Sequence, residues 1–279
     1  MMNEKFKEFI IQLLERTKLK KKYIYRLCND ESNLLLFRQA FTHSSFDDQH
    51  NYEFFELLGD ATCNKIIVWY LKDRFPFLQN QEGVKIISRL RINLVSKKNF
   101  FLIASNLGFA PFILCQKEIM VQRNKNILED VFEAFIGVTE YLLDKYIYPG
   151  SGYGICFRFL KHILDQQCIS LQYEDLYDPI TRLKETLDYY RSNQKFPEIW
   201  GSLSIEHSKI DQGRYRLFLY QVNKSENNKK ELLYTITCQS DLDEGKQLIC
   251  NIVLKQLEQK GYKRPIPNYY DKISTLISS

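Results

Sequence analysis

One segment, NYEFFELLGD at 51–60, constrains the fold more than any other, because it places charge and a glycine inside an otherwise apolar helical pattern. Glu53, Glu56 and Asp60 stand at positions i, i+3 and i+7, so they share one face of a helix. Gly59 lies in the interior of that helix, where glycine costs up to about 1 kcal/mol relative to alanine. The glycine predicts that a second helix approaches closely at this point.

A second segment, NILEDVFEAFIG at 126–137, repeats this design, with Asp130 and Glu133 at the edge of an apolar stripe and Gly137 one turn beyond. If the two helices pack face to face, four carboxylates meet in apolar surroundings, where like charges repel and burial costs free energy. Divalent cations remove both penalties, and oxygen ligands without His or Cys favour Mg²⁺ or Mn²⁺ over zinc or copper. The alternative is that these are surface carboxylates beside a core, which is common at the edges of amphipathic helices.

The composition is that of a soluble globular protein. In 279 residues, 44% are hydrophobic and 26% charged, and the net charge of +5 permits a nucleic-acid partner without arguing for one. Seven dispersed cysteines without a CxxC, and four histidines that complete no zinc spacing, predict reduced thiols. The start has no secretory pattern, and no apolar run approaches the roughly 18 residues of a membrane span. We therefore expect a soluble intracellular protein, in the cytoplasm rather than the nucleus, with no membrane partner.

Helical periodicity predominates up to residue 169. An amphipathic helix is expected at 5–27, ending in the basic cluster Lys18, Lys20, Lys21 and Lys22, which is typical of a solvated surface. The further helices expected are 34–41, 51–73, 82–96, 97–107, 126–145 and 154–169.

The pattern changes near residue 178. A helix at 178–192 is followed by three runs of strand character at 199–207, 214–222 and 231–239, and a helix at about 241–260 closes the set. This α-β-β-β-α order predicts a small α+β domain at 178–262, after an all-α domain at 1–172. The tail, 263–279, is expected to be a poorly packed end.

Four motifs in the first domain resemble those of the ribonuclease III family, and they occur in the family's order. NYEFFELLGDA resembles the signature N-E-R-L-E-F-L-G-D-A/S, and ILEDVFEAFIG resembles I-L-A-D-x-F-E-A-x-I-G. QAFTHSSF (39–46) resembles A-L-T-H-x-S-Y/F, and QEGVKIISRLRINLVS resembles E-G-x-L-x-x-L-R-x-x-L-V-S with about two extra residues. Since no acid is spaced to orient His43, the His43–Ser44 pair is expected to pack or form hydrogen bonds rather than act as a nucleophile.

The resemblance implies roles for particular carboxylates. Glu56, Asp60, Asp130 and Glu133 match the family's metal-binding catalytic residues, with Mg²⁺ as the cofactor and Mn²⁺ as a possible substitute. Glu53 and Glu82 match two further acidic positions at the rim of the cleft. Phe54, which replaces an arginine of the family pattern, and Phe55 are candidates for the interface of a homodimer.

The second domain resembles the double-stranded-RNA-binding domain that commonly follows a ribonuclease III domain. DPITRLKETL resembles D-P-K-T-x-L-Q-E-x-x, which makes Glu185 a candidate contact to RNA, with Lys246 as a second, weak one. The basic S-K-K-x-A start of the last helix is replaced by a stretch containing Asp241, Asp243 and Glu244, which would repel phosphates. Two interpretations stay open, weak RNA binding and a protein-contact module, and the second is slightly favoured.

The resemblance as a whole implies an endoribonuclease that cuts double-stranded RNA. It implies 5′-phosphate and 3′-hydroxyl products, staggered ends and a homodimer with one site per subunit. Two alternatives are a non-catalytic, ribosomal-protein-like subunit built on the same fold and an accessory subunit of another ribonuclease III. Relatives without catalysis typically lose the carboxylates, so the intact set in this chain favours the enzyme.

Overall fold

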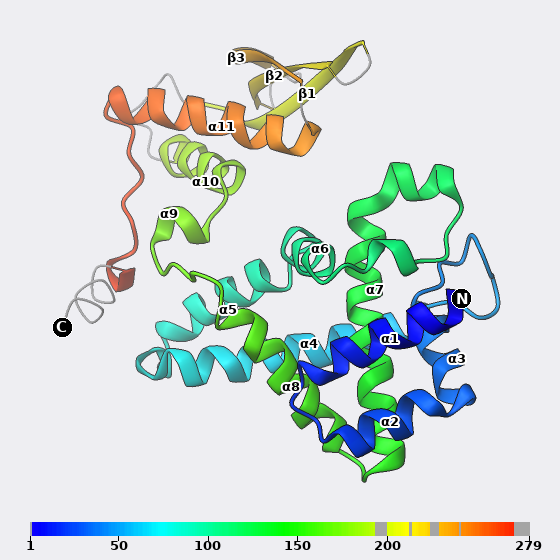
Figure 1. Ribbon diagram of the computed structural model, residues 1–279. Helices are drawn as coiled ribbons and strands as arrows, with labels where there is room; N and C mark the ends of the chain where they lie inside the picture. Colours follow the sequence, from blue (N-terminus) through cyan, green and yellow to red (C-terminus); the bar gives the residue numbers. More distant parts are fainter. Residues whose placement is uncertain (1, 193–199, 212–213, 224–228, 240, 271–279) are drawn as a thin grey trace. The chain divides into compact units, whose positions relative to one another are not determined.

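The computed structural model describes residues 2–192, 200–211, 214–223, 229–239 and 241–270 (Figure 1). The chain divides into two compact units, residues 1–169 and residues 170–279. The first unit is helical, and the second combines helices with a three-stranded antiparallel sheet. The expected fold class, an all-α domain followed by a small α-β-β-β-α domain, is confirmed.

The helices of the first unit mostly follow the expected ranges. They are α1 (Met2–Glu15), α2 (Lys21–Asn29), α3 (Glu31–Ala40), α4 (Glu53–Arg74), α5 (Gly83–Leu94), α6 (Lys97–Asn106), α7 (Lys117–Tyr146) and α8 (Ser151–Leu164), with 3₁₀ turns at Pro76–Leu78 and Ala110–Phe112. Their buried faces are rich in aromatic rings, such as Phe41, Phe109 and Phe135, which contact one another.

The single helix expected at 5–27 is wrong, because the chain forms two helices there, α1 and α2. Thr17 breaks the run: its hydroxyl donates to the carbonyl of Leu14 at 2.6 Å and accepts the amide of Leu19 at 3.1 Å. Lys18 takes a left-handed backbone conformation with φ of 59°. These local side-chain bonds compete with the helical ones, and the basic cluster lies in the resulting turn and the start of α2.

Helix α7 begins nine residues earlier than the expected start at 126, at Lys117. The backbone is kinked at Arg123, where φ is −121° and ψ is 20°. Residues 121–126 are exposed. This segment has no apolar stripe because it covers no core, so the hydrophobic pattern could not reveal it.

Glycines fix the contact between α4 and α7. A Cβ atom placed on Gly59 would lie 1.8 Å from the carbonyl oxygen of Glu133, and one placed on Gly137 would lie 2.1 Å from the carbonyl oxygen of Phe55. Each glycine therefore receives the backbone of the other helix where any side chain would collide. The close approach predicted from Gly59 is confirmed, and it brings the two acidic segments together.

The aromatic residues at the start of α4 differ in burial. Phe54 is 61% exposed and Leu57 is 72% exposed, three residues apart on the outer face of the helix. Phe55, in contrast, is 3% exposed and its ring packs against Tyr141. The expectation that Phe55 is available to a second subunit is therefore wrong, because the α4–α7 contact buries it.

The second unit contains α9 (Tyr173–Leu176), which the pattern did not predict, α10 (Pro179–Ser192), β1 (Ser202–Asp211), β2 (Arg214–Asn223), β3 (Lys229–Cys238) and α11 (Leu242–Gln259). The strand order is β1-β2-β3, with Ile205 opposite Leu219 and Leu219 opposite Tyr234. Leu217 and Leu219 of β2 share one core with Leu187 of α10 and Val253 of α11, so both helices cover the same face of the sheet.

The described part of the tail is packed, contrary to the expectation of a poorly packed end. Tyr270 is 4% exposed and its ring lies 5.4 Å from that of Tyr173, edge to face. The carbonyl of Lys263 accepts a hydrogen bond from the hydroxyl of Tyr190 at 2.8 Å. The sequence of the tail has no periodicity, so it could not predict these aromatic contacts. Residues 271–279 lie outside the described part of the chain.

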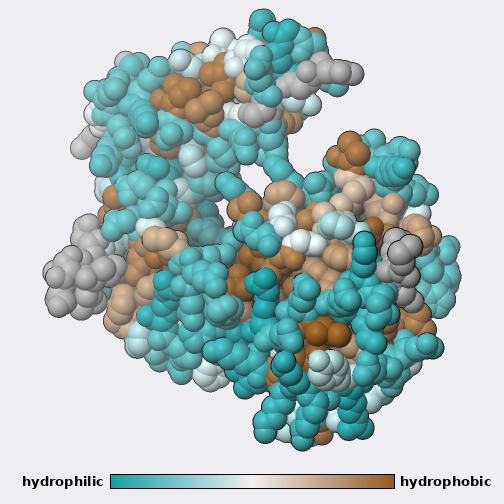
Figure 2. Space-filling model, in the orientation of Figure 1, coloured by the Kyte–Doolittle hydropathy of each residue, from teal (hydrophilic) through white to brown (hydrophobic). Residues whose placement is uncertain are grey.

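The surface in view is mostly hydrophilic, with apolar patches between hydrophilic areas (Figure 2). None of the described helices has the length and apolar content required to span a bilayer.

We predict that Gly59→Ala destabilises the protein by about 3 kcal/mol, because the new methyl group would push apart two helix backbones. Gly154→Ala is the matched control, since Gly154 also lies within a helix but a Cβ there has open space around it. The control should gain about 0.5–1 kcal/mol from helix propensity. Chemical denaturation of both variants measures the difference, and equal stability of the two would contradict the close packing.

Candidate metal centre

Four carboxylates project from adjoining turns of α4 and α7, as the spacing predicted. Glu133 is 6% exposed, Glu56 and Asp130 are half-buried, and Asp60 is exposed. Because the helices touch at Gly59 and Gly137, the acids share one small region although the two segments are far apart in the sequence.

The carboxylates perturb one another. Burial, reinforced by the charges of Glu129 and Asp60, raises the pKa of Glu133 to about 9. Burial, reinforced by Asp130 and Glu53, raises the pKa of Glu56 to about 7. Burial also raises the pKa of Asp130. These shifts mean that the protein alone does not stabilise four negative charges here, so the cluster favours protons or cations.

Polar neighbours orient two of the acids. The hydroxyl of Tyr52 donates to Oδ2 of Asp130 at 2.8 Å. The amide of Asn64 donates to Oδ1 of Asp60 at 2.7 Å, and Arg91 of α5 donates to Oδ1 of that amide at 2.6 Å. None of these three residues was predicted to belong to the site, although Tyr52 and Arg91 lie inside two of the four family motifs.

A fifth acid, Glu129, also belongs to this region and was missed. It is 7% exposed, and its Oε2 lies 3.4 Å from Nζ of Lys97, an ion pair without hydrogen-bond geometry. Lys97 lowers the pKa values of Glu129, Asp130 and Glu56 against the effect of burial, which places a cation beside the acids. The sequence signal that could have identified Glu129 is its position in ILED (127–130), directly before Asp130.

The two rim positions differ. Glu53 is exposed at the first residue of α4, and its charge raises the pKa values of Glu56 and Asp130, so it lies at the edge of the cluster. Glu82 is exposed at the N-cap position of α5. It is not among the main charges that shift the pKa values of Glu56, Asp130 and Glu133.

The donor set fits a hard divalent cation. All four side chains offer oxygen, and burial with mutual repulsion has raised the pKa values of three of them. Within the described part of the chain, no three His, Cys, Asp or Glu side chains are arranged so that they could hold a metal ion as they stand. Side-chain rotation on the fixed helix pair would have to bring the oxygens together.

In the second unit, the residues expected to contact RNA are engaged within the protein. Oε2 of Glu185 accepts a hydrogen bond from the hydroxyl of Tyr173 at 3.1 Å and forms an ion pair with Arg264. Nζ of Lys246 lies 3.1 Å from Oδ1 of Asp243.

The acidic start of α11 has a structural cause. The side chain of Asp241 caps the helix by accepting the amide of Asp243 at 2.9 Å, and acids in the first turn favour the helix dipole. The same residues place negative charge at the N-terminus of α11.

Comparison with known proteins decides the family. Residues 33–142 match the family model described as Ribonuclease-III-like. A putative ribonuclease 3 of Invertebrate iridescent virus 6 is 35% identical over 240 residues, which cover 82% of this chain and 79% of that protein. The chain belongs to the ribonuclease III family.

Bacterial proteins are also similar to this chain. Ribonuclease 3 of Lactobacillus acidophilus is 30% identical over 206 residues, covering 71% of this chain and 79% of that protein. Among solved structures, the nuclease domain of ribonuclease III from Campylobacter jejuni matches with 28% identity and a TM-score of 0.42, over 56% of this chain and 96% of that one. The family assignment predicted from the four motifs is confirmed, and with it an endoribonuclease of the ribonuclease III type.

The raised pKa values predict how the metal-free protein responds to pH. A carboxyl group whose pKa is higher in the folded than in the unfolded state stabilises the fold below the unfolded pKa and loses that contribution as pH rises through the folded pKa. Ionisation of Glu133 should therefore lower the free energy of unfolding progressively from about pH 5 to about pH 9. Ionisation of Glu56 should lower it from about pH 5 to about pH 7.

Glu133→Gln should remove the loss of stability that ionisation of Glu133 causes as pH rises. In a chelator, the melting temperature of Glu133→Gln minus that of the wild type should increase steadily from pH 5 to pH 9, and Mg²⁺ should reduce the difference by stabilising the wild type. Asp73→Asn, at an exposed position of α4, is the control and should show no such trend. A difference for Glu133→Gln that does not change with pH would contradict the burial of this acid.

Proposed function

We propose that the protein is a Mg²⁺-dependent endoribonuclease that cleaves double-stranded RNA to products with 5′-phosphates, 3′-hydroxyls and staggered ends. Glu56, Asp60, Asp130 and Glu133 would hold the metal, with Mn²⁺ as a possible substitute, and Glu53 and Glu82 would line the rim. The proposal rests above all on the four carboxylates that a glycine-lined helix pair brings together in a chain of the ribonuclease III family.

In this mechanism the protein supplies position and charge. Bound Mg²⁺ would stabilise negative charge on the scissile phosphate and lower the pKa of water at the site. The carboxylates bind and orient the cation, and the rigid contact of α4 with α7 keeps their backbone positions fixed. Water attacks the phosphorus in line: its oxygen bonds to the phosphorus as the bond to the 3′ oxygen breaks. One of its protons passes, through solvent, to the 3′ oxygen, which leaves a 5′-phosphate and a 3′-hydroxyl. Lys97 offsets part of the acidic charge that would repel the RNA.

We also propose a homodimer in which each subunit cuts one strand. Phe54 and Leu57 are exposed on α4 beside the site, and a contact with a second copy would bury both. Light scattering should give twice the mass of one chain, and a monomer at working concentration would contradict this part of the proposal.

The setting proposed is intracellular, with the cytoplasm preferred to the nucleus. All seven cysteines are unpaired, which suits a reducing compartment.

For the second unit we favour a protein-contact module over an RNA-binding domain, although its fold suits either. Its candidate RNA contacts, Glu185 and Lys246, are both paired within the unit, and its last helix begins with acids. The stretch NKSENNKK at 223–230, whose lysines could add contacts to RNA, lies largely outside the described residues. Weak RNA binding is the alternative for this unit.

The central test is cleavage of long double-stranded RNA in Mg²⁺ by the wild type, Glu133→Ala and Asp73→Asn. The wild type and Asp73→Asn should cut, and Glu133→Ala should lose at least about a hundredfold in rate, as expected when a ligand of the catalytic metal is removed. Intact RNA with the wild type in both Mg²⁺ and Mn²⁺ would favour a non-catalytic or accessory subunit. Full activity of Glu133→Ala would refute the assignment of the site.

The acidic start of α11 gives a second prediction. In a Glu133→Gln background that should not cut, Asp243→Lys with Glu244→Lys should tighten binding to double-stranded RNA and steepen the salt dependence, by about 0.9 in log–log slope for each phosphate gained. The control has the same charge change at two exposed positions of α1, Glu8→Lys with Glu15→Lys. Tight binding with a steep slope before any lysine is added would show that the unit already binds RNA, contrary to the interpretation favoured here.

A further inference from the structure

Tyr52 lies at the centre of a set of contacts that the proposed reaction does not yet explain. It directly precedes α4 and is 3% exposed, so its ring is fixed by packing. Its hydroxyl, at the far end of the ring, donates to Oδ2 of Asp130 on α7 at 2.8 Å. A buried tyrosine thus joins the start of one acidic helix to a carboxylate of the other.

The segment 41–45 contacts both the backbone and the ring of Tyr52. The backbone amide of Tyr52 donates to the carbonyl of Thr42 at 2.9 Å. The ring of His43 packs edge to face against the ring of Tyr52, with centroids 5.6 Å apart. Both the main chain and the side chain of Tyr52 are therefore positioned by the motif QAFTHSSF, whose His43 was expected to pack rather than to act as a nucleophile.

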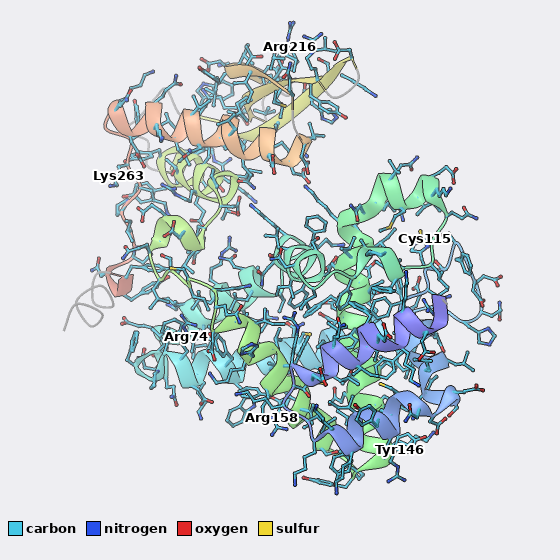
Figure 3. The ribbon with its side chains drawn as sticks, viewed as in Figure 1. Arg74, Cys115, Tyr146, Arg158, Arg216 and Lys263 are labelled. Atoms are coloured by element: carbon cyan, nitrogen blue, oxygen red, sulfur yellow. The ribbon has the colours of Figure 1, made fainter. Side chains whose placement is uncertain are left out.

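His43 is fixed in turn. Its backbone amide donates to the carbonyl of Leu114 at 2.8 Å, and its Nδ1 accepts the amide of Ser45 at 2.9 Å. The hydroxyl oxygen of Ser45 accepts the amide of Gln116 at 3.2 Å and lies 3.5 Å from Sγ of Cys115. Cys115 is labelled in Figure 3, in the connection that leads into α7. The motif is thus tied to the segment that precedes the second acidic helix.

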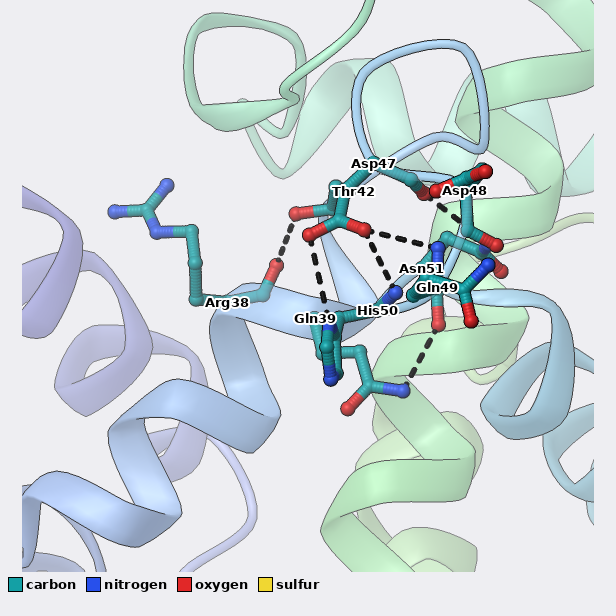
Figure 4. Close-up of polar contacts among 8 residues, drawn as sticks. All are labelled: Arg38, Gln39, Thr42, Asp47, Asp48, Gln49, His50 and Asn51. Atoms are coloured by element: carbon teal, nitrogen blue, oxygen red, sulfur yellow. Dashed lines mark hydrogen bonds and ion pairs between the residues drawn. The ribbon is translucent and has the colours of Figure 1, made fainter.

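The loop that leads into α4 adds further restraints (Figure 4). Oδ1 of Asp47 accepts the amides of Gln49 and His50, each at 2.9 Å, and the side chain of Gln39 donates to the carbonyl of Asn51 at 3.1 Å. These bonds define the path of the chain immediately before Tyr52.

We propose that Tyr52 is a positioning residue for the metal centre: its hydroxyl holds Asp130 by one oxygen, Oδ2, and presents the other, Oδ1, to the divalent cation. The inference rests on the proposed function, since it takes Asp130 as a ligand. His43 and Ser45 act one step further away, by holding the tyrosine ring and the segment that carries it.

Two physical effects of the hydroxyl support this role. The donated bond engages Oδ2 of Asp130 and so leaves Oδ1 as the oxygen available to a cation. The bond also removes rotational freedom from the Asp130 side chain, so less freedom is lost when the cation binds. Partners that orient a metal-binding carboxylate in this way typically contribute about tenfold to a hundredfold to metal affinity or activity.

The test is Tyr52→Phe in the full chain, since this change removes the hydroxyl and keeps the buried ring. Calorimetric titration with Mn²⁺, without RNA, should show binding weakened by about tenfold or more. In cleavage assays the Mg²⁺ concentration for half-maximal rate should rise, while the rate at saturating Mg²⁺ recovers. The melting temperature in a chelator should match that of Tyr70→Phe, a control that also removes the hydroxyl of a buried tyrosine, here one that bonds to Arg74.

Asp130→Asn separates the inference from the function on which it rests. If Asp130→Asn loses Mn²⁺ binding and Tyr52→Phe retains it, the role of Tyr52 is refuted and the metal site stands. If Asp130→Asn binds Mn²⁺ as the wild type does, the proposed site itself fails. If Tyr52→Phe melts well below Tyr70→Phe without a loss of affinity, the tyrosine is structural only.

A second variant, His43→Ala, keeps the hydroxyl and removes the ring beside it. It should weaken Mn²⁺ binding in the same direction as Tyr52→Phe, and unchanged binding would refute the part assigned to His43.

Discussion

The backbone contact between α4 and α7 is the interaction on which the rest of the nuclease unit depends. Gly59 and Gly137 let the two helices approach until the carbonyl oxygens of Glu133 and Phe55 occupy the space of missing side chains. No other residue type permits that distance, because any Cβ would collide. The contact buries Phe55 and Glu133 in one step, so it creates part of the core and the acidic cluster together.

The cost of that arrangement is electrostatic, and the surroundings offset it only in part. Burial and mutual repulsion raise the pKa values of Glu56, Asp130 and Glu133, while Lys97 and Tyr52 act in the opposite direction on Asp130. One lysine and one hydroxyl cannot balance five acids in a half-buried region. This excess of negative charge is the physical reason for our proposal that a divalent cation binds at this surface.

The second unit has the expected fold, but acids stand at the start of its last helix where the resemblance predicts basic residues. Its α-β-β-β-α framework is intact, with Leu217 and Leu219 packed beneath α10 and α11. At the start of α11, however, capping by Asp241 stabilises the helix and simultaneously removes an attraction for phosphate. Glu185 is held by Arg264 from the tail. The framework depends on apolar residues, whereas the attraction of a charged ligand depends on surface charge. Fold and ligand preference can therefore diverge independently.

The sequence by itself determined the family and most of the order of the elements, and it singled out the four carboxylates that we propose as metal ligands, because helix spacing and the interior glycines are local properties that leave a readable pattern. Only the tertiary structure decided which side chains surround those acids. Tyr52, Lys97 and Arg91 reach the site through contacts between segments far apart in the chain. Phe55 proved to be buried against residues of α7 that lie more than eighty positions away. The break at Thr17, the exposed start of α7 and the packed tail at Tyr270 were likewise hidden, since none of them follows from apolar periodicity.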